Sequence, residues 1–418
     1  MPPMSPVARR FAAAAALLLS LAIVALLVMR GLGVQIGLSA TPTPAAATPS
    51  PRPSEPAASQ DPLAAFAEIE QQVRAIRGLP AAQVGPPRIL TRAELAQVLP
   101  GLLEPALDDV SLHALGLLTA GQEIVSLTNR LYAAQVLGYY DFDAKRMVVV
   151  SDAGLTAAAR VTYAHEYTHA LQDAAFHAGA AQDRVAGERD QALALLALEE
   201  GDASTAMVLW AIGHLSADQL AGITATPLPD MSGIPAWMVR LLEFPYLPGS
   251  EFVGRLYASG GWAGVDAAYG HPPASTEQVL HPEKYSGGEV PVAVEALDPW
   301  TALGAGWSHV LDTTMGEEWI ATWLEGLGVS AKAAAAAAAG WGGDRLTVAN
   351  TADGRWALAW RIGWDAPGDA TEFEAAYAGL QSRMSFAARA VHVSDRETVV
   401  LQASSASILG TIASLAGG

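Results

Sequence analysis

The residues with the clearest potential for chemistry are two histidines, His165 and His169, with Glu166 directly after the first. Residues four apart on an α-helix lie one above the other on the same face, so both imidazole rings can point at one ion. Glu166 lies about 100° further round the helix axis, which places its carboxylate beside such an ion rather than on it. This H-E-x-x-H spacing is typical of a zinc site that has two histidine ligands and a neighbouring general base.

A catalytic zinc ion takes three protein ligands and keeps one position open, so a third ligand must come from another segment. The stretch LEEGDAS at 198–204 offers Glu199, Glu200 and Asp202. Gly201 has no side chain, which suits the point where this segment comes closest to the first helix. Glu200 is therefore the favoured ligand, and Glu199 is the next choice. Asp202 could instead accept the second N–H of a ligand histidine and fix its orientation.

Two strands and two helices are needed to position these residues. The segment VLGYYDFDAKRMVVVSD predicts two strands around the turn DFDAK, of which 146–150, RMVVV, is the better strand. The pattern then changes to a long helix at about 156–177, which carries the motif, and to a second helix at 190–212. A mostly helical region continues to about Ala268, interrupted by the turn FPYLPGS. The stretch 270–285 is rich in proline and polar residues and predicts an ordered loop or short turns.

The segments on either side of this region have different patterns. A helical pattern covers 63–77, and TRAELAQVLPGLL predicts a further helix behind a threonine cap. The last third of the chain predicts a helix at 313–326 and then a hairpin that turns at Asp353-Gly354. A helix at 369–383 and two strands, ARAVHVSD and ETVVLQAS, follow.

We expect an α+β fold divided into four parts. In the largest part, 63–290, a mainly helical core carries the metal motif behind a β-hairpin, and 291–418 form a small α+β region packed on it. The other two parts are an N-terminal membrane segment at 1–30 and a linker at 31–62. The linker is rich in proline, alanine and threonine and cannot build a core of its own.

The N-terminal segment indicates where the protein is located. Residues 11–29 are uncharged and apolar over a length that is about enough to span a bilayer. Arg9 and Arg10 precede this segment and Arg30 follows it, which favours an N-terminus inside the cytoplasm and a body outside. A cleaved signal peptide is the alternative, because Leu-Ser-Ala at 38–40 would suit a signal peptidase. Both readings predict an extracytoplasmic body, either anchored in the cell membrane or secreted.

The composition narrows the range of partners. The net charge is −18, and lysine occurs only at positions 145, 284 and 332, so no basic patch is available for nucleic acid. The chain has no cysteine, which excludes disulfides, thiolate metal sites and cysteine nucleophiles. The expected partners are a peptide or protein substrate and, through residues 11–29, a membrane. The sequence does not indicate an oligomeric state.

H-E-x-x-H followed by E-G-x-A on the next helix resembles the gluzincin zinc metallopeptidases. HEYTHALQD with EEGDA is more particularly similar to bacterial, membrane-attached members of that clan, as are the later phrases GGWAGVDAAYGHPPASTEQVLHPEKY and WRIGWD. The likeness extends from about Tyr139 onward. The chain departs from better-known gluzincins because it lacks their Glu-x-x-x-Asp on the second helix, which puts the orienting role of Asp202 in doubt.

The resemblance implies a zinc ion held by His165, His169 and Glu200, with Glu166 as the base. It also implies an edge strand just before the first helix, here 146–150, on which an extended peptide can lie by strand addition.

In such a site the metal lowers the pKa of a water molecule, and Glu166 takes the proton as the water attacks a carbonyl carbon. A second hydrogen-bond donor should stabilise the oxyanion that forms. His281 in LHPEKY is the preferred candidate for this catalytic role, followed by Tyr285, Tyr246 and Tyr140.

The function predicted from the sequence is that of an extracytoplasmic, membrane-tethered zinc metallopeptidase. One alternative is a non-catalytic surface module that keeps the fold for binding or adhesion. Another is a zinc hydrolase that acts on a non-peptide amide. Glu166 favours an enzyme, because a binding module has no need for a base beside its metal.

Overall fold

The computed structural model describes residues 62–99, 105–225 and 230–417. The expected membrane segment at 11–29 and the linker up to residue 61 lie outside the described residues. Within the described part of the chain, no helix has both the length and the apolar character needed to cross a membrane.

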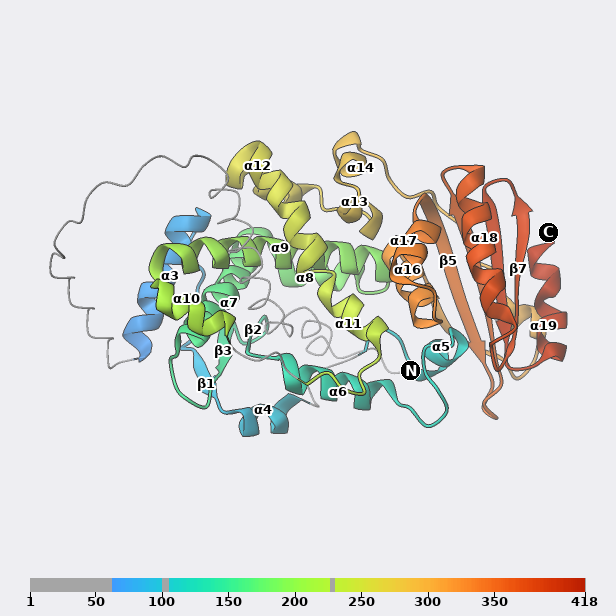
Figure 1. The fold of residues 1–418 in the computed structure, drawn as a ribbon, viewed down its shortest axis with the longest axis horizontal. Coiled ribbons are helices and arrows are strands. Elements are labelled where there is room, and N and C mark those ends of the chain that lie inside the picture. Colours follow the sequence, from blue (N-terminus) through green and yellow to red (C-terminus); the bar gives the residue numbers. More distant parts are fainter. Residues whose placement is uncertain (1–61, 100–104, 226–229, 418) are drawn as a thin grey trace, which may run out of the picture.

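The protein has an α+β fold in which helices predominate. Figure 1 shows a three-stranded sheet towards the left of the molecule, a five-stranded sheet at the right, and helices between them. The metal motif belongs to the helical region beside the smaller sheet.

The first described elements are mostly short. They are α3 (Pro62–Arg77), β1 (Arg88–Leu90), α4 (Arg92–Val98), α5 (Asp109–Ala114) and α6 (Ile124–Gln135). α3 confirms the helix predicted at 63–77. α4 has the predicted threonine cap, because the Thr91 hydroxyl accepts from the backbone N–H of Glu94, whose carboxylate accepts from the backbone N–H of Thr91.

The small sheet contains the predicted hairpin, formed by β2 (Gly138–Asp141) and β3 (Arg146–Val150). The prediction that 146–150 is an edge strand is wrong. β1, which the sequence analysis did not anticipate, pairs in parallel with β3, so the strand order is β1-β3-β2. β3 is buried from Met147 to Val150, as suits a central strand covered on both faces. The strand at the edge of the hairpin is β2.

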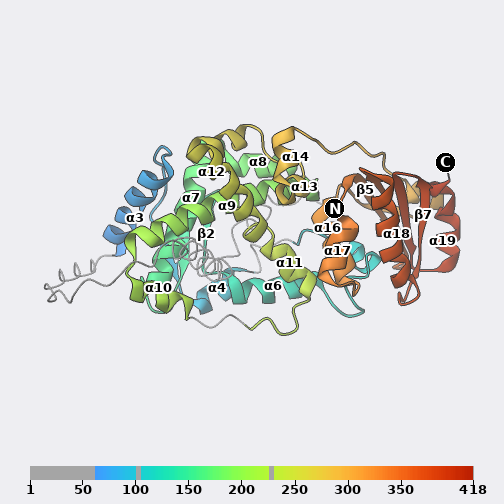
Figure 2. The ribbon, with the colours of Figure 1, turned by 45° about the horizontal axis from the view of Figure 1, so that its top comes forward.

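The two long helices predicted around the metal motif are present. α7 (Ala157–Phe176) begins after Thr156, whose hydroxyl accepts from the backbone N–H of Ala159, and it ends at His177 in the left-handed conformation. The short α8 (Ala178–Val185) leads to α9 (Arg189–His214). α7 and α9 pack against each other and against α3, and Figure 2 shows them side by side.

Gly201 lies at a different contact from the one expected. The sequence predicts that its missing side chain serves the approach of α9 towards α7. In the structure Gly201 faces α12 (Leu247–Gly270). A Cβ at residue 201 would lie 2.2 Å from the carbonyl oxygen of Gly249, and a Cβ at residue 249 would lie 2.4 Å from that of Ala197. α9 and α12 therefore cross with their backbones in contact.

The remaining helices of this region are short. They are α10 (Ala217–Thr224), α11 (Ala236–Glu243), α13 (Thr276–Leu280), α14 (Pro282–Gly287) and α15 (Pro299–Leu303). The turn FPYLPGS is shorter than predicted, because α12 already begins at Leu247 with a proline in its first turn. The stretch 270–285 contains short helical turns, as predicted.

The C-terminal region is built on an antiparallel sheet with the strand order β4-β5-β6-β8-β7. The predicted hairpin, the helix at 369–383 and the two final strands are present. The helix predicted at 313–326 begins only at Gly316, because the residues before it form β4. The elements are β4 (Ser308–Thr313), α16 (Gly316–Gly326), α17 (Ala331–Ala338), β5 (Trp341–Asn350), β6 (Trp356–Trp364), α18 (Pro367–Gln381), β7 (Ala387–Ser394), β8 (Glu397–Ala403), α19 (Ala406–Ile412) and the 3-10 helix η2 (Ala413–Ala416).

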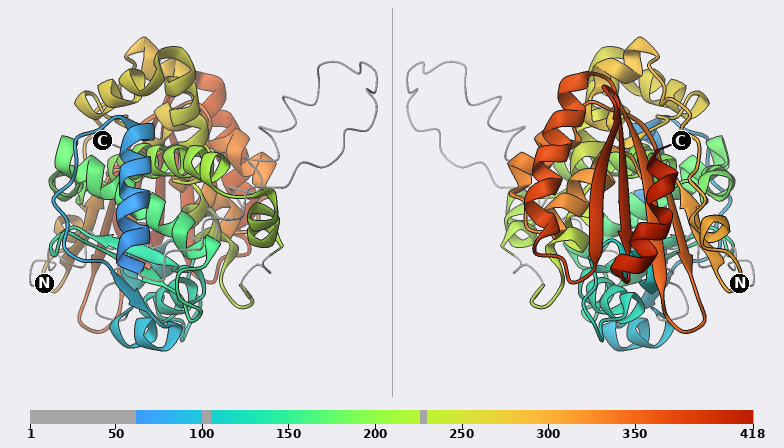
Figure 3. Two further views of the ribbon diagram at one scale, coloured as in Figure 1. Left: turned by 90° about the vertical axis from the view of Figure 1, so that its left-hand side faces the viewer. Right: turned by 90° about the vertical axis from the view of Figure 1, so that its right-hand side faces the viewer.

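Both faces of this sheet are covered. Along β6, Leu358, Trp360 and Ile362 pack into the core that contains α16, α17 and α18, whereas Ala357 and Ala359 pack on the other side with α19. The right-hand view of Figure 3 shows α18 and α19 beside the strands.

One hydrophobic core crosses the boundary expected near residue 290. It contains Trp237 of α11, Trp323 of α16 and Trp360 of β6, all of them buried. The indole N–H of Trp323 also donates to the carbonyl oxygen of Leu115 at 2.8 Å. The helical region and the C-terminal region are therefore joined through a shared interior.

The crossing of α9 and α12 can be tested by adding one methyl group. We expect Gly201→Ala to lower the free energy of unfolding by about 3 kcal/mol, because the new Cβ would meet backbone atoms that cannot move aside. Gly213→Ala in the same helix is the matched control, since nothing lies within 4 Å of its Cβ position. The control should stabilise the protein by up to about 1 kcal/mol. Urea denaturation of both variants measures this, and equal effects would contradict the contact.

Candidate metal centre

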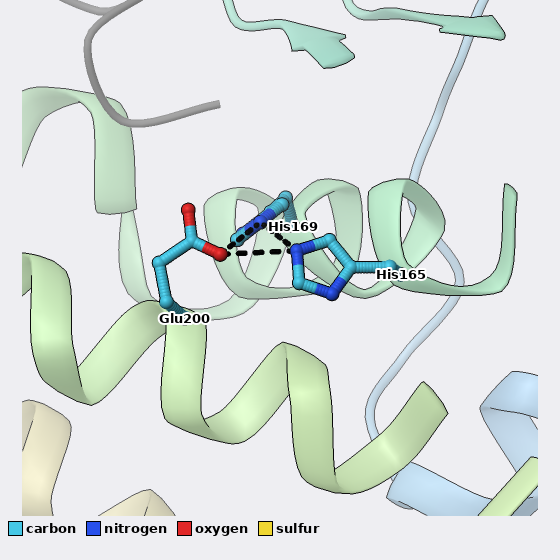
Figure 4. Close-up of side chains that lie close together, drawn as sticks. All are labelled: His165, His169 and Glu200. Atoms are coloured by element: carbon cyan, nitrogen blue, oxygen red, sulfur yellow. Dashed lines mark hydrogen bonds and ion pairs between the residues drawn. The ribbon is translucent and has the colours of Figure 1, made fainter. Parts of the chain in front are cut away.

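Three side chains from two helices meet at one point inside the protein. His165 and His169 lie one turn apart on α7, and Glu200 reaches them from α9 (Figure 4). Their exposed fractions are 1%, 4% and 0%, so the group is shielded from solvent. Of the three acidic residues considered from the sequence, Glu200 is the one that the structure brings to both histidines.

The candidate ligand atoms are spaced as one small cation requires. Glu200 Oε2 lies 3.0 Å from His165 Nε2 and 3.5 Å from His169 Nε2, and the two Nε2 atoms are 3.0 Å apart. A tetrahedral zinc ion with ligands at about 2.0–2.1 Å would hold them about 3.3 Å from one another. Within the described residues, Glu200 Oε1 and His165 Nδ1 have no hydrogen-bond partner. The short distances between two imidazole nitrogens and one carboxylate oxygen therefore fit a metal such as zinc.

Gln172 orients one of the two histidines. His169 Nδ1 donates to Gln172 Oε1 at 2.9 Å, which leaves His169 Nε2 for a metal. The Gln172 amide nitrogen donates to the carbonyl oxygen of Glu199 at 2.9 Å and to Asp202 Oδ2 at 3.1 Å. The prediction that Asp202 itself accepts from a ligand histidine is wrong, because Gln172 lies between them. Gln172 could have been found from the sequence, since it follows His169 by three residues on the same helix.

Asp202 is held in turn by Arg77, the last residue of α3. Arg77 Nε donates to Asp202 Oδ1 at 2.7 Å and Nη2 donates to Oδ2 at 3.1 Å, and both residues are fully buried. The Tyr269 hydroxyl donates to Asp202 Oδ2 at 2.8 Å. A chain of hydrogen bonds thus connects α3, which crosses the outer end of the molecule in the left-hand view of Figure 3, to His169. We refer to Arg77, Asp202 and Gln172 as the α3 relay.

Glu166 lies beside the three candidate ligands and outside their set. It is fully buried, and within the described residues neither carboxylate oxygen has a hydrogen-bond partner. Burial raises the pKa of Glu166 to about 8, while the charge on His169 and the nearby backbone amide of Tyr140 oppose that rise. The edge strand β2 runs alongside α7, because Gly138 allows a close approach: a Cβ there would lie 2.5 Å from Thr162 Cγ2, and the Cγ of Glu166 is 3.5 Å from the same position.

The pKa values of the three candidate ligands depend on one another. Burial disfavours the charged form of each side chain, but attraction between carboxylate and imidazole raises the pKa of His169 to about 10 and lowers that of Glu200 to about 2. The pKa of His165 is lowered, because burial and the charge on His169 outweigh its contact with Glu200. A proton on His169 can therefore balance the negative charge of Glu200, as a bound cation would.

The structure does not bring His281 to this group. His281 Nε2 lies 3.0 Å from Glu317 Oε1 on α16, and Nδ1 lies 3.8 Å from Glu283 Oε1. Among the described residues, neither these ion pairs nor its hydrogen bonds involve the candidate ligands or Glu166. Two of the tyrosines considered with it are also engaged elsewhere: the Tyr285 hydroxyl donates to the carbonyl oxygen of His271, and that of Tyr140 donates to Asp173.

Tyr246 is the predicted oxyanion donor that does lie at the group. Its ring is nearly parallel to that of His165, with an interplanar angle of 28° and centroids 6.4 Å apart. Burial raises the pKa of Tyr246 well above its usual value, and the charges on Glu200 and Glu166 add to that rise. The phenol is therefore protonated at neutral pH and close to both carboxylates. The segment FPYLPG places it there, because Tyr246 directly precedes α12.

Other acidic residues near the motif have structural partners. The Glu199 carboxylate accepts from the Gln182 amide, and Asp173 pairs with Lys145. A second cluster of carboxylates in the described chain, formed by Glu277, Glu289 and Asp365, surrounds the ammonium group of Lys284. The positive charge that balances these three carboxylates is therefore that of the Lys284 side chain.

Comparison with known families covers only the C-terminal region. A family model described as "Domain of unknown function (DUF8575)" matches residues 307–411, from just before β4 to most of α19. The match includes neither α7 nor α9. No curated protein and no solved structure matches this chain.

The orienting role of Gln172 predicts a change in metal affinity. We expect Gln172→Ala to weaken zinc binding by about 10- to 100-fold, because His169 loses the acceptor that fixes its ring. Competition with a coloured chelator measures the dissociation constant. Gln135→Ala is the matched control, since Gln135 is a buried glutamine on α6 that contacts Met231 instead. Equal affinities for the two variants would contradict the role.

The raised pKa of His169 predicts that zinc binding releases a proton. At pH 7 a group with a pKa of about 10 is protonated, and its Nε2 must lose that proton before it can bind a metal. We expect about one proton to be released per zinc ion, so the apparent affinity falls roughly tenfold for each pH unit below 7. Calorimetry in buffers of different ionisation enthalpy counts the protons, and a count of zero would contradict the assignment.

Proposed function

We propose that this protein is a zinc-dependent metallopeptidase. The observation that supports the proposal best is the buried meeting of His165, His169 and Glu200, with the unliganded carboxylate of Glu166 beside it. The metal would be held by the first three residues, and zinc suits two imidazoles and one carboxylate in this spacing.

The surrounding elements are consistent with a zincin-like core, which is part of the proposal. The hairpin β2–β3 precedes the helix with the H-E-x-x-H motif, α8 and α9 follow it, and α9 carries the third ligand. The resemblance to gluzincins implies this order of hairpin, motif helix and ligand helix, although it implied 146–150 and not β2 as the edge strand.

Different residues of the chain would carry out different steps of the reaction. A zinc ion bound here would supply the Lewis acidity that turns a water molecule into a nucleophile near neutral pH. Glu166 would accept the proton of the attacking water and pass it to the amine that leaves. Tyr246 would donate its O–H to the carbonyl oxygen as negative charge develops there. The peptide would lie in an extended conformation along β2, the edge strand of the small sheet.

We also propose that the catalytic body lies outside the cytoplasm. The support is the apolar segment at 11–29 with two arginines before it, followed by a proline-rich linker. The substrate would then be an extracytoplasmic peptide or protein. Neither segment belongs to the described residues.

The proposal is tested with the full chain and a substitution that keeps the shape of the site. We expect Glu166→Gln to reduce the cleavage of casein and of a peptide library by about 10²- to 10⁴-fold, because the base is lost. Its zinc content, measured by elemental analysis, should match that of the unmodified protein, because Glu166 is not a ligand.

Two results would count against the proposal. Zinc bound in equal amounts by the unmodified protein and His165→Ala would show that the three side chains do not form the metal site. Stoichiometric zinc without cleavage by the unmodified protein would favour the non-catalytic binding module.

A further inference from the structure

A largely apolar cavity of about 240 Å³ adjoins the proposed metal centre. Its walls come from α6, α8, α9 and α11, together with the segment at 105–107 and Trp319 of α16. Figure 1 shows these helices in the middle of the molecule, between the two sheets.

The cavity follows the face of α9 that leads to Glu200. Ala192, Leu193 and Leu196 line it, and the next residue at the same three- and four-residue spacing is Glu200. Leu196 is one turn, about 6 Å along the axis, from the ligand position. A group that occupied the cavity would therefore lie next to an atom held at the metal.

Two tyrosines join the cavity to the centre. Tyr246 lines the cavity and stacks over His165. Tyr132 of α6 lines it too, and burial raises the pKa of its hydroxyl to about 12, with the charge on Glu200 as the second cause. The cavity and the metal centre are thus neighbouring parts of one site.

The walls favour a bulky apolar group and disfavour a cation. They are formed mainly by leucine, tryptophan and other apolar side chains, such as Leu241 and Trp237, and they include no aspartate or glutamate among the described residues. A lysine or arginine side chain would lose its water there without gaining a counter-charge, and Arg189 in the wall would repel it. The volume suits one large side chain, since pockets for whole small-molecule ligands measure roughly 300–1,000 Å³.

We propose that this cavity is a specificity pocket for a large apolar side chain of the substrate, next to the bond that is cleaved. The inference rests on the proposed peptidase function and names its substrate class: peptides with leucine, phenylalanine, methionine or tryptophan beside the scissile bond. Burying such a side chain removes its apolar surface from water, and this gain orients the neighbouring peptide bond at the metal.

The first test uses the full chain, loaded with zinc, on a degenerate peptide library. We expect one position beside the cleaved bond to be enriched in large apolar residues. In individual peptides, glycine or lysine at that position should lower kcat/KM by about 10- to 100-fold. Cleavage without an apolar preference on either side of the bond would overturn the pocket while leaving the peptidase function intact.

Variants then connect the preference to the cavity. Ala192→Phe fills the cavity, so it should shift the preferred residue to alanine or valine. Leu196→Ala enlarges the cavity, so it should improve cleavage beside tryptophan. Ala336→Phe is the matched control, an exposed alanine on α17 outside the cavity, and it should leave the preference unchanged. If both cavity variants bind zinc and keep the original preference, the proposal is wrong.

A binding measurement separates this proposal from the peptidase function. The zinc-loaded Glu166→Gln protein is titrated with fluorescent peptides that carry phenylalanine, glycine or lysine at one position, and with N-lauroylglycine. We expect the phenylalanine peptide to bind about 10-fold or more tightly than the others. This result would support the pocket even if no peptide were cleaved. Equal binding of the peptides, or stronger binding of N-lauroylglycine, would overturn it.

Discussion

The interior of this protein is organised around carboxylates that have been removed from water. An ionised carboxylate in such a place costs several kcal/mol unless a cation or several donors face it. Glu200 is matched by two imidazoles from α7, and Asp202, two residues later on α9, is matched by the guanidinium of Arg77 from α3. The two pairs tie α9 to helices on different sides. They leave little freedom in the position of α9, so the geometry at Glu200 is fixed from both sides.

Much of the neighbourhood of the site can be predicted because its signals are local. The periodicity of α7 and α9, the hairpin before them and the spacing of His165 and His169 all depend on residues within a few turns of one another. Glu200 does reach both histidines, but the reason for favouring it does not hold, because Gly201 faces α12 and not α7. Local signals are also sufficient for the C-terminal hairpin, whose turn contains Asp353 and Gly354.

The features that the sequence did not reveal depend on contacts between distant segments. β1 has only three residues, and it becomes a strand because β3 offers a free side to pair with. Arg77 reaches Asp202 across 125 positions, and nothing around either residue indicates the partner. Gly201 was assigned to the wrong neighbour, because a glycine in a helix shows that some backbone comes close without showing which. His281 was preferred over Tyr246 for its chemistry alone, and the packing of α13 against α16 holds it at Glu317.

The α3 relay sets an N-terminal limit for any fragment that keeps the hydrogen-bonded support of His169. α3 begins at Pro62, and its last residue carries the guanidinium on which Asp202, Gln172 and finally His169 depend. A protease that shed the body by cutting before Pro62 would leave the relay complete. A cut inside α3 would separate Arg77 from the rest of its helix and so weaken the ion pair between Arg77 and Asp202. A cut just ahead of this helix, far from the motif in the sequence, would thus leave the hydrogen bonds that support His169 intact.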